Sequence, residues 1–160
     1  MKNKLKLLHI ITHLPIGGAQ DNTLYTIELL DKNKYDISLC CNFEGELVER
    51  AKNIDGVKLF NIPFLCRDIS LYNDIRAFIS LYKLFKNENF TIIHTHSSKA
   101  GLLARVAAKL NKTPIIIHTV HGFAFNDFMT LFKKKFYIII EKILAIWTDV
   151  LITVSNLNKK

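Results

Sequence analysis

Three segments of the sequence carry groups that can bind or transform a ligand, and each follows an apolar stretch. The first holds Gly17 and Gly18, where backbone N–H groups at a helix start can approach an anion. The second, from His94 to Gly101, mixes hydroxyls, imidazoles and a lysine, which suits phosphate or sugar hydroxyls. The third, residues 118–123, places a histidine before a glycine.

Each segment also has a purely structural interpretation. The glycines match neither a dinucleotide fingerprint nor a Walker loop, so they fit a tight turn equally well. Ser98 fits the N-cap of a following helix, and His94 fits a hydrogen-bonded histidine inside a strand. His121 falls at a strand end, where Gly122 lets the chain turn, and we expect it to be the best-placed titratable side chain.

Paired histidines raise the question of a metal site. His94 and His96 form one pair, and His118 and His121 form a second. Metal-binding histidines usually come with carboxylates or cysteines and with an oriented outer shell of hydrogen bonds. Asp127 is the only acid near these pairs in the sequence, so we predict no metal and no cofactor.

Helical and strand patterns alternate along the chain and predict how these segments are held. Short runs that are apolar on both faces, each followed by a helical pattern, are typical of a parallel sheet covered on both faces. Right-handed connections then give an α/β fold, a Rossmann-like doubly wound parallel sheet. The expected strands are 6–12, 35–41, 57–60, 90–95, 114–120 and 150–154, and the expected helices are 19–30, 46–52, 71–86, 98–110 and 128–147.

Charge is distributed unevenly between the two halves of the chain. Residues 81–160 hold 12 basic and 4 acidic side chains, which accounts for the whole net charge of +8. Such asymmetry favours an anionic partner, although a solvated lysine-rich surface explains it as well. Nucleic acid is not expected, because the sequence has only four arginines and lacks an aromatic RNA-binding strand or a helix-turn-helix pattern.

The expected helix 128–147 combines a cluster of lysines, Lys133 to Lys135, with many aromatic and aliphatic residues. Such a helix can dock on an anionic membrane surface, to which each nearby Lys or Arg contributes about 1 kcal/mol. We expect most of its apolar residues to cover the sheet and only its lysine-rich start to approach lipid. A helix with a solvated outer face is the alternative.

Cysteine spacing and the apolar stretches indicate the cellular compartment. Three cysteines without a C-x-x-C spacing support neither a zinc ribbon nor a redox motif. The N-terminal apolar stretch lacks a cleavage site, and the later apolar stretch carries charges that a spanning helix of about 20 residues avoids. We predict a cytoplasmic protein, with peripheral attachment at the inner face of the cell membrane left open.

Four motifs in this order resemble the first domain of retaining glycosyltransferases of family 4. They are residues 8–20 with the Gly-Gly-Ala-Gln step, 92–105 with His-Thr-His-Ser-Ser-Lys, 118–125 with His-Thr-Val-His-Gly-Phe, and 149–155. The most similar subgroup comprises bacterial enzymes that build capsular or surface polysaccharide on lipid carriers. The resemblance implies one half of a GT-B fold, in which two Rossmann-like domains face each other across a cleft.

The same resemblance assigns expected roles to residues of this chain. His121 would be catalytic and lie against the donor sugar, and Gly17 and Gly18 would approach the donor diphosphate and the acceptor. The remaining expected substrate-binding residues are His96, Ser97, Ser98, Lys99 and Gly122. The implied partners are a nucleotide-sugar donor and a lipid-linked or saccharide acceptor, and the family requires no metal.

One part of the family pattern has no counterpart here. The second domain, with its paired glutamates and most of the nucleotide-sugar contacts, is absent, so residues 1–160 are expected to be the N-terminal domain alone. Transfer is then expected to need the missing C-terminal half, in cis or in trans, and whether the chain is an enzyme by itself stays open. A non-catalytic module that binds a phosphorylated or lipid-linked sugar is the alternative.

Overall fold

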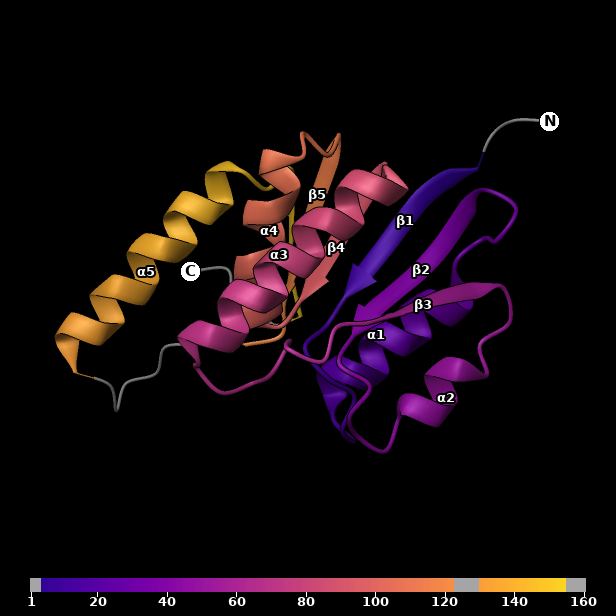
Figure 1. The fold of residues 1–160 in the computed structure, drawn as a ribbon, viewed down its shortest axis with the longest axis horizontal. Helices are drawn as coiled ribbons and strands as arrows, with labels where there is room; N and C mark the ends of the chain where they lie inside the picture. The colour runs from indigo at the N-terminus through magenta and orange to yellow at the C-terminus, as the bar shows by residue number, and fades with distance from the viewer. Residues whose placement is uncertain (1–3, 123–129, 155–160) are drawn as a thin grey trace.

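A six-stranded parallel sheet forms the centre of the part of the chain that the structure describes, residues 4–122 and 130–154 of a computed structural model (Figure 1). The strand order is β3-β2-β1-β4-β5-β6, which is the order of a doubly wound fold. The predicted Rossmann-like α/β fold is therefore confirmed. The strands are β1 Leu5–Ile10, β2 Tyr35–Cys41, β3 Val57–Asn61, β4 Ile92–His96, β5 Ile115–Val120 and β6 Val150–Thr153.

Helices cover the sheet in two layers. The helices are α1 Gly18–Leu29, α2 Val48–Lys52, α3 Leu71–Glu88, α4 Ser98–Leu110 and α5 Leu131–Ile146. Alternating residues of β2 separate the layers, because Leu39 packs with the apolar residues of α1 and α2 whereas Cys40 packs with those of α3 and α4. α5 lies beside α4 on the second face (Figure 1).

Local sequence signals explain where α3 begins and how closely α4 approaches the sheet. Ser70 is the N-cap of α3, and its hydroxyl accepts a hydrogen bond from the N–H of Asn73 at 3.4 Å. Small residues of α4 let it pack tightly, and a Cβ on Gly101 would lie only 2.6 Å from Cε1 of His118. A glycine is therefore required where α4 crosses β5.

The expectation that α5 covers the sheet with most of its apolar residues is wrong. Only Leu144 of this helix is buried, because α5 rests on α4 and projects away from the strands (Figure 1). Apolar side chains at helical spacing are exposed along one side of it, namely Phe132, Phe136, Ile139, Ile143 and Ile146. Phe128, the expected start of the helix, lies outside the described residues.

The edge strand β6 also departs from the expected two-sided cover. Val150, Leu151 and Ile152 are 40–48% exposed, so described residues leave both faces of this strand partly open. Crossing a bilayer takes a longer or more apolar helix than any found in the described residues.

Candidate functional site

The loops that follow β1, β4 and β5 meet at one edge of the sheet, as expected for the carboxyl ends of adjacent parallel strands. The hydroxyls of Thr12 and Ser97 share a hydrogen bond of 2.8 Å, which joins the first loop to the second. The hydroxyl of Ser98 donates to the carbonyl of Gly122 at 3.4 Å, which joins the second loop to the third. The three loops that carry the segments singled out in the sequence therefore lie in contact with one another.

The Gly-Gly segment forms the start of α1. Gly17 is the N-cap, with an extended backbone that any residue can adopt, and Gly18 is the first helical residue. A Cβ at Gly18 would meet nothing within 4 Å, so none of the residues that the structure describes covers the helix at this position. Neither backbone conformation requires glycine, and the first N–H groups of a helix lack intrahelical acceptors. The position therefore suits an approaching anion.

The start of α4 differs from the interpretation of Ser98 as its N-cap. The predicted N-cap at Ser98 is wrong, since Ser97 is the N-cap and Ser98 begins α4. Ser97 has φ 63 and ψ 151, a conformation that residues with a side chain rarely adopt, and its hydroxyl caps no N–H of the helix. Its hydroxyl instead holds Thr12, so the strained turn connects two loops of the site.

Lys99 lies at the same helix start but turns toward α3. Its ammonium group lies 2.5 Å from Oδ1 of Asp74 and also donates to the carbonyl of Asp68. The side chains of this ion pair are mostly buried, at 16% and 20% exposed. Lys99 therefore holds the α3 and α4 starts together as well as adding positive charge near the site.

A row of three histidines leads from the core to this edge. Nδ1 of His9 in β1 lies 3.1 Å from Nε2 of His96, and Nδ1 of His96 lies 3.2 Å from Nε2 of His121. His9 and His96 are buried, whereas His121 is partly exposed. His9 was not among the predicted site residues, and its position in β1, paired with His94 across the β1–β4 ladder, is what brings it there.

His94 packs against this row without joining it. Its ring centroid lies 4.8 Å from that of His9 and 4.3 Å from that of His96, and its Nε2 shares a 2.7 Å hydrogen bond with the hydroxyl of Thr119. His9, His94 and His96 offer nitrogens within 4.8 Å of one another, close enough for a metal ion. Both nitrogens of His96 are already hydrogen-bonded, so an ion would have to displace one of these bonds.

His118 lies apart from the other site histidines. It belongs to the opposite face of the sheet, beside Gly101 of α4, and its Nδ1 shares a 2.8 Å hydrogen bond with the hydroxyl of Thr95. The buried Arg105 lies on that face too, donating to Glu141 of α5 at 2.9 Å. The sequence pair His118 and His121 therefore does not form a two-ligand metal site.

Burial sets the protonation of these rings. Desolvation lowers the pKa of His94 to about 4 and the pKa of His118 to about 3. It holds the pKa of His9 and His96 well below the ordinary value, with the neighbouring His94 adding to the effect. The pKa of His121 is lowered as well, again by burial. All five imidazoles are therefore neutral at physiological pH.

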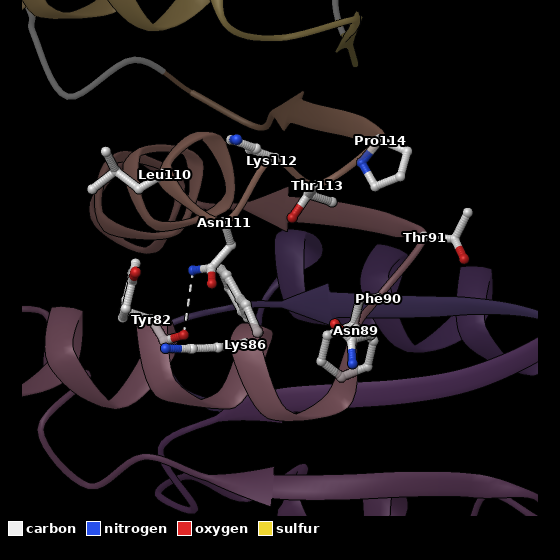
Figure 2. A pocket seen from close by; sticks show the side chains of 11 residues that line it. Tyr82, Lys86, Asn89, Phe90, Thr91, Leu110, Asn111, Lys112, Thr113 and Pro114 are labelled. Atoms are coloured by element: carbon white, nitrogen blue, oxygen red, sulfur yellow. Dashed lines mark hydrogen bonds between the residues drawn. The ribbon is translucent and has the colours of Figure 1, made fainter.

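A separate cavity of about 470 Å³ lies at the opposite edge of the sheet, between the ends of α3 and α4 (Figure 2). Its walls include Phe90, Thr113 and Pro114, at the amino ends of β4 and β5, and the amide of Asn111 donates to the carbonyl of Tyr82 across it. The sequence motifs contribute nothing to this cavity. It has no connection with the histidine site.

Sequence matches to known proteins are all to glycosyltransferases in the three comparisons that follow. A family model described as Glycosyltransferase Family 4 matches residues 16–160. A galactosyltransferase of Escherichia coli, described as UDP-Gal:alpha-D-GlcNAc-diphosphoundecaprenol alpha-1,3-galactosyltransferase, is 41% identical over 99% of this chain and 40% of its own length. The capsular polysaccharide biosynthesis glycosyltransferase CapM of Staphylococcus aureus is 30% identical over 98% of this chain and 38% of its own length.

The fold agrees with these sequence matches. The crystal structure of MurG from Acinetobacter baumannii superimposes with a TM-score of 0.67 at 13% identity, covering 95% of this chain and 41% of that protein. The predicted half of a GT-B fold is thereby confirmed. The chain spans about 40% of the length of the curated relatives that it matches along nearly its whole length.

Proposed function

The chain belongs to glycosyltransferase family 4, and from that premise we propose that it forms the acceptor-side half of a retaining glycosyltransferase. The reaction would move a sugar from a nucleotide-sugar donor to a lipid-linked or polysaccharide acceptor. The observation that carries this proposal is the meeting of three loops at one sheet edge, joined by the Thr12–Ser97 and Ser98–Gly122 hydrogen bonds.

The start of α1 is our candidate for the donor diphosphate. α1 has 12 residues, and its N-terminal N–H groups and dipole favour negative charge. The space around Gly18 leaves room for phosphate oxygens. His121, joined through His96 to the same edge, would lie against the donor sugar, where its ring can hydrogen-bond an oxygen of the sugar or of the departing diphosphate.

The acceptor is proposed to lie beside the α4 start. Ser97 and Ser98 offer hydroxyls there, Gly122 lets the chain pass closely, and Lys99 contributes charge while it pairs with Asp74. A diphosphate-linked acceptor fits the chemistry of hydroxyl and ammonium donors at a helix N-terminus. The E. coli relative is named for such an acceptor.

A second half is proposed to supply the other wall of the active site. Orientation and charge stabilisation of the transition state need groups on both sides of the reacting sugar. The relatives are more than twice as long as the matched segment. We expect donor binding by the 160-residue chain alone to be weak, and transfer to need that half in cis or in trans.

An anionic membrane surface is the proposed location of the acceptor. The outer side of α5 exposes Phe132 and Phe136, and Lys133 and Lys135 are exposed beside them. Apolar side chains flanked by lysines can enter the headgroup region of a bilayer, with the charges adding attraction to anionic lipid. A membrane surface at α5 would bring lipid-linked acceptors to the same domain.

The test combines this chain with the remaining part of the E. coli relative, fused or co-expressed, and measures sugar transfer to a diphosphoundecaprenol-linked acceptor. UDP- and GDP-sugars are compared as donors. We expect transfer that H121A reduces about 100-fold or more, by analogy with the loss of one oriented hydrogen bond at a reacting centre. K86A, an exposed change at the opposite sheet edge, is the control and keeps full activity.

Two outcomes would contradict the proposal. Absence of both binding and transfer with every nucleotide sugar would remove the glycosyltransferase function. Binding of the lipid-linked sugar that H121A leaves unchanged, with no transfer, would favour the non-catalytic binding module.

A further inference from the structure

We propose that His9, His96 and His121 form a hydrogen-bond chain with a single direction, in which His96 is a positioning residue. The chain fixes His121 as a hydrogen-bond donor at its Nδ1 and prevents it from acting as a base there. The use of that donor in sugar transfer rests on the proposed function. The direction of the hydrogen-bond chain does not rest on it.

Each hydrogen bond of this chain joins one ring nitrogen of a histidine to one ring nitrogen of the next. Nδ1 of His9 and Nε2 of His96 are 3.1 Å apart, and Nδ1 of His96 and Nε2 of His121 are 3.2 Å apart. Both separations are near those of ordinary hydrogen bonds between nitrogens. Two ring nitrogens are left at the ends, Nε2 of His9 in the core and Nδ1 of His121 at the sheet edge.

Neutral imidazoles allow this chain only two states. Each ring carries one N–H, so each link needs a donor on one side and a lone pair on the other. If His9 donates from Nδ1, then His96 accepts at Nε2 and must donate from Nδ1, and His121 accepts at Nε2 and carries its proton on Nδ1. If the direction is reversed, every proton moves to Nε2, and His121 presents a lone pair at Nδ1.

The inner end of the chain decides between the two states. Nε2 of His9 is buried and has no hydrogen-bond partner among the described residues. In the first state this atom is an unpaired lone pair, and in the second it is an unpaired N–H. Buried N–H groups without acceptors are rare in folded proteins and unpaired acceptors are less so, which favours the first state.

The surroundings of the three rings keep them neutral. The His94 ring lies tilted against the rings of His9 and His96, and its own hydrogen bond goes to Thr119, so it supplies neither a proton nor a counter-charge. No carboxylate is hydrogen-bonded to a ring of the chain within the described residues. Burial lowers the pKa of all three rings, which removes the doubly protonated form that would end the directionality.

The consequence for a ligand is a neutral donor of fixed orientation. His121 offers Nδ1–H to an oxygen acceptor, such as a sugar hydroxyl or a phosphate oxygen, and its other nitrogen is occupied by His96. A ring held at one nitrogen cannot rotate without losing that hydrogen bond. His96 therefore acts on the ligand only through His121.

The direct test is the tautomer of each ring in the 160-residue chain labelled with ¹⁵N-histidine, read from long-range ¹H–¹⁵N correlations at pH 7.5. We expect Nδ1–H, with an unprotonated Nε2, at His9, His96 and His121. A neutral Nε2–H form at any of these three positions overturns the proposal. This measurement needs no variant and no activity.

Two substitutions of His96 separate positioning from packing. H96N keeps an amide N–H near the place of Nδ1 and should leave His121 in its Nδ1–H form. H96F fills the space without a donor, so His121 should move to the Nε2–H form that histidine prefers in water. H118Q changes a buried histidine on the opposite face and should alter nothing at His121. An unchanged tautomer of His121 in folded H96F contradicts the positioning role.

Transfer kinetics then distinguish this inference from the proposed function. In the assembled transferase, H96F should lower kcat by about 10- to 100-fold with a smaller change in KM, and H96N should recover most of it. Equal kcat for H96F and wild type would contradict the positioning role. Absence of transfer by wild type would instead reject the proposed function, while the tautomers still decide the direction of the chain.

Discussion

Lowering the pH from 7 to 5 is expected to destabilise the folded chain because of the histidines buried in and around the site. His9, His94, His96 and His118 are each 8% exposed or less. Desolvation holds their pKa values below the ordinary value, to about 4 for His94 and about 3 for His118. In the unfolded chain the same side chains have ordinary pKa values near 6.5.

The sign follows from which state binds more protons. Between about pH 6.5 and pH 5 the unfolded chain takes up a proton at each of these histidines and the folded chain does not, so stability falls as the pH falls. At pH 5 each histidine then costs roughly 2 kcal/mol, and the four together cost roughly 8 kcal/mol. That loss is comparable to the whole stability of a typical domain, about 5–15 kcal/mol.

The assay is urea unfolding of the chain at pH 7.5, 6.5, 5.8 and 5.0, followed by circular dichroism. We expect the free energy of unfolding to be constant above pH 7 and to fall with increasing slope below pH 6.5, with loss of the fold near pH 5. H118Q removes one of the four protons and should reduce the loss at pH 5 by roughly 2 kcal/mol relative to its own value at pH 7.5.

A free energy of unfolding that stays within about 1 kcal/mol between pH 7.5 and pH 5 would contradict the expected effect of burial. It would mean that the imidazoles bind protons in the folded state with pKa values near the ordinary value. An equal pH dependence for H118Q and wild type would assign the loss to other groups.

Three further changes test the packing and the membrane surface. G45A should lower the free energy of unfolding by about 3 kcal/mol in a urea titration, because Gly45 has φ +114 and a Cβ there would lie 2.2 Å from the backbone of Leu14. The control G18A, whose Cβ would meet nothing within 4 Å, should lower it by less than about 1 kcal/mol, and equal losses for the two variants would contradict the geometry. E141A should cost about 3 kcal/mol, because Arg105 is 0% exposed and would keep a buried charge without its carboxylate; unchanged stability would show that water reaches this arginine. Sedimentation with vesicles containing phosphatidylserine should show salt-sensitive binding that a combined K133E/K135E change weakens and that neutral phosphatidylcholine vesicles lack; equal binding to both vesicle types would leave these exposed lysines as a solvated surface.

The strands and most helices of this chain are predictable because their patterns are local. Short apolar runs between helical stretches predict a parallel sheet, and Ser70, a residue type that favours N-caps, precedes α3. The gathering of the Gly-Gly, His-Ser-Ser-Lys and His-Gly segments at one edge follows from the same topology, because parallel strands present their carboxyl ends together.

The errors arise where a residue's partner is distant in sequence. The apolar pattern of α5 indicates that one side of the helix packs against another surface, but it does not show whether that surface is the sheet. His9 enters the site only because β1 and β4 are neighbours in a particular register. Lys99 finds its counter-charge on Asp74 in another helix, a pairing that no local pattern encodes.

Sugar transfer by the chain joined to the remaining part of the E. coli relative is the most direct test of the proposed acceptor-side role. We predict transfer from one nucleotide sugar to a diphosphoundecaprenol-linked acceptor, reduced about 100-fold or more in H121A and retained in K86A. No transfer with any donor, from an assembly in which both parts are folded and associated, would contradict it.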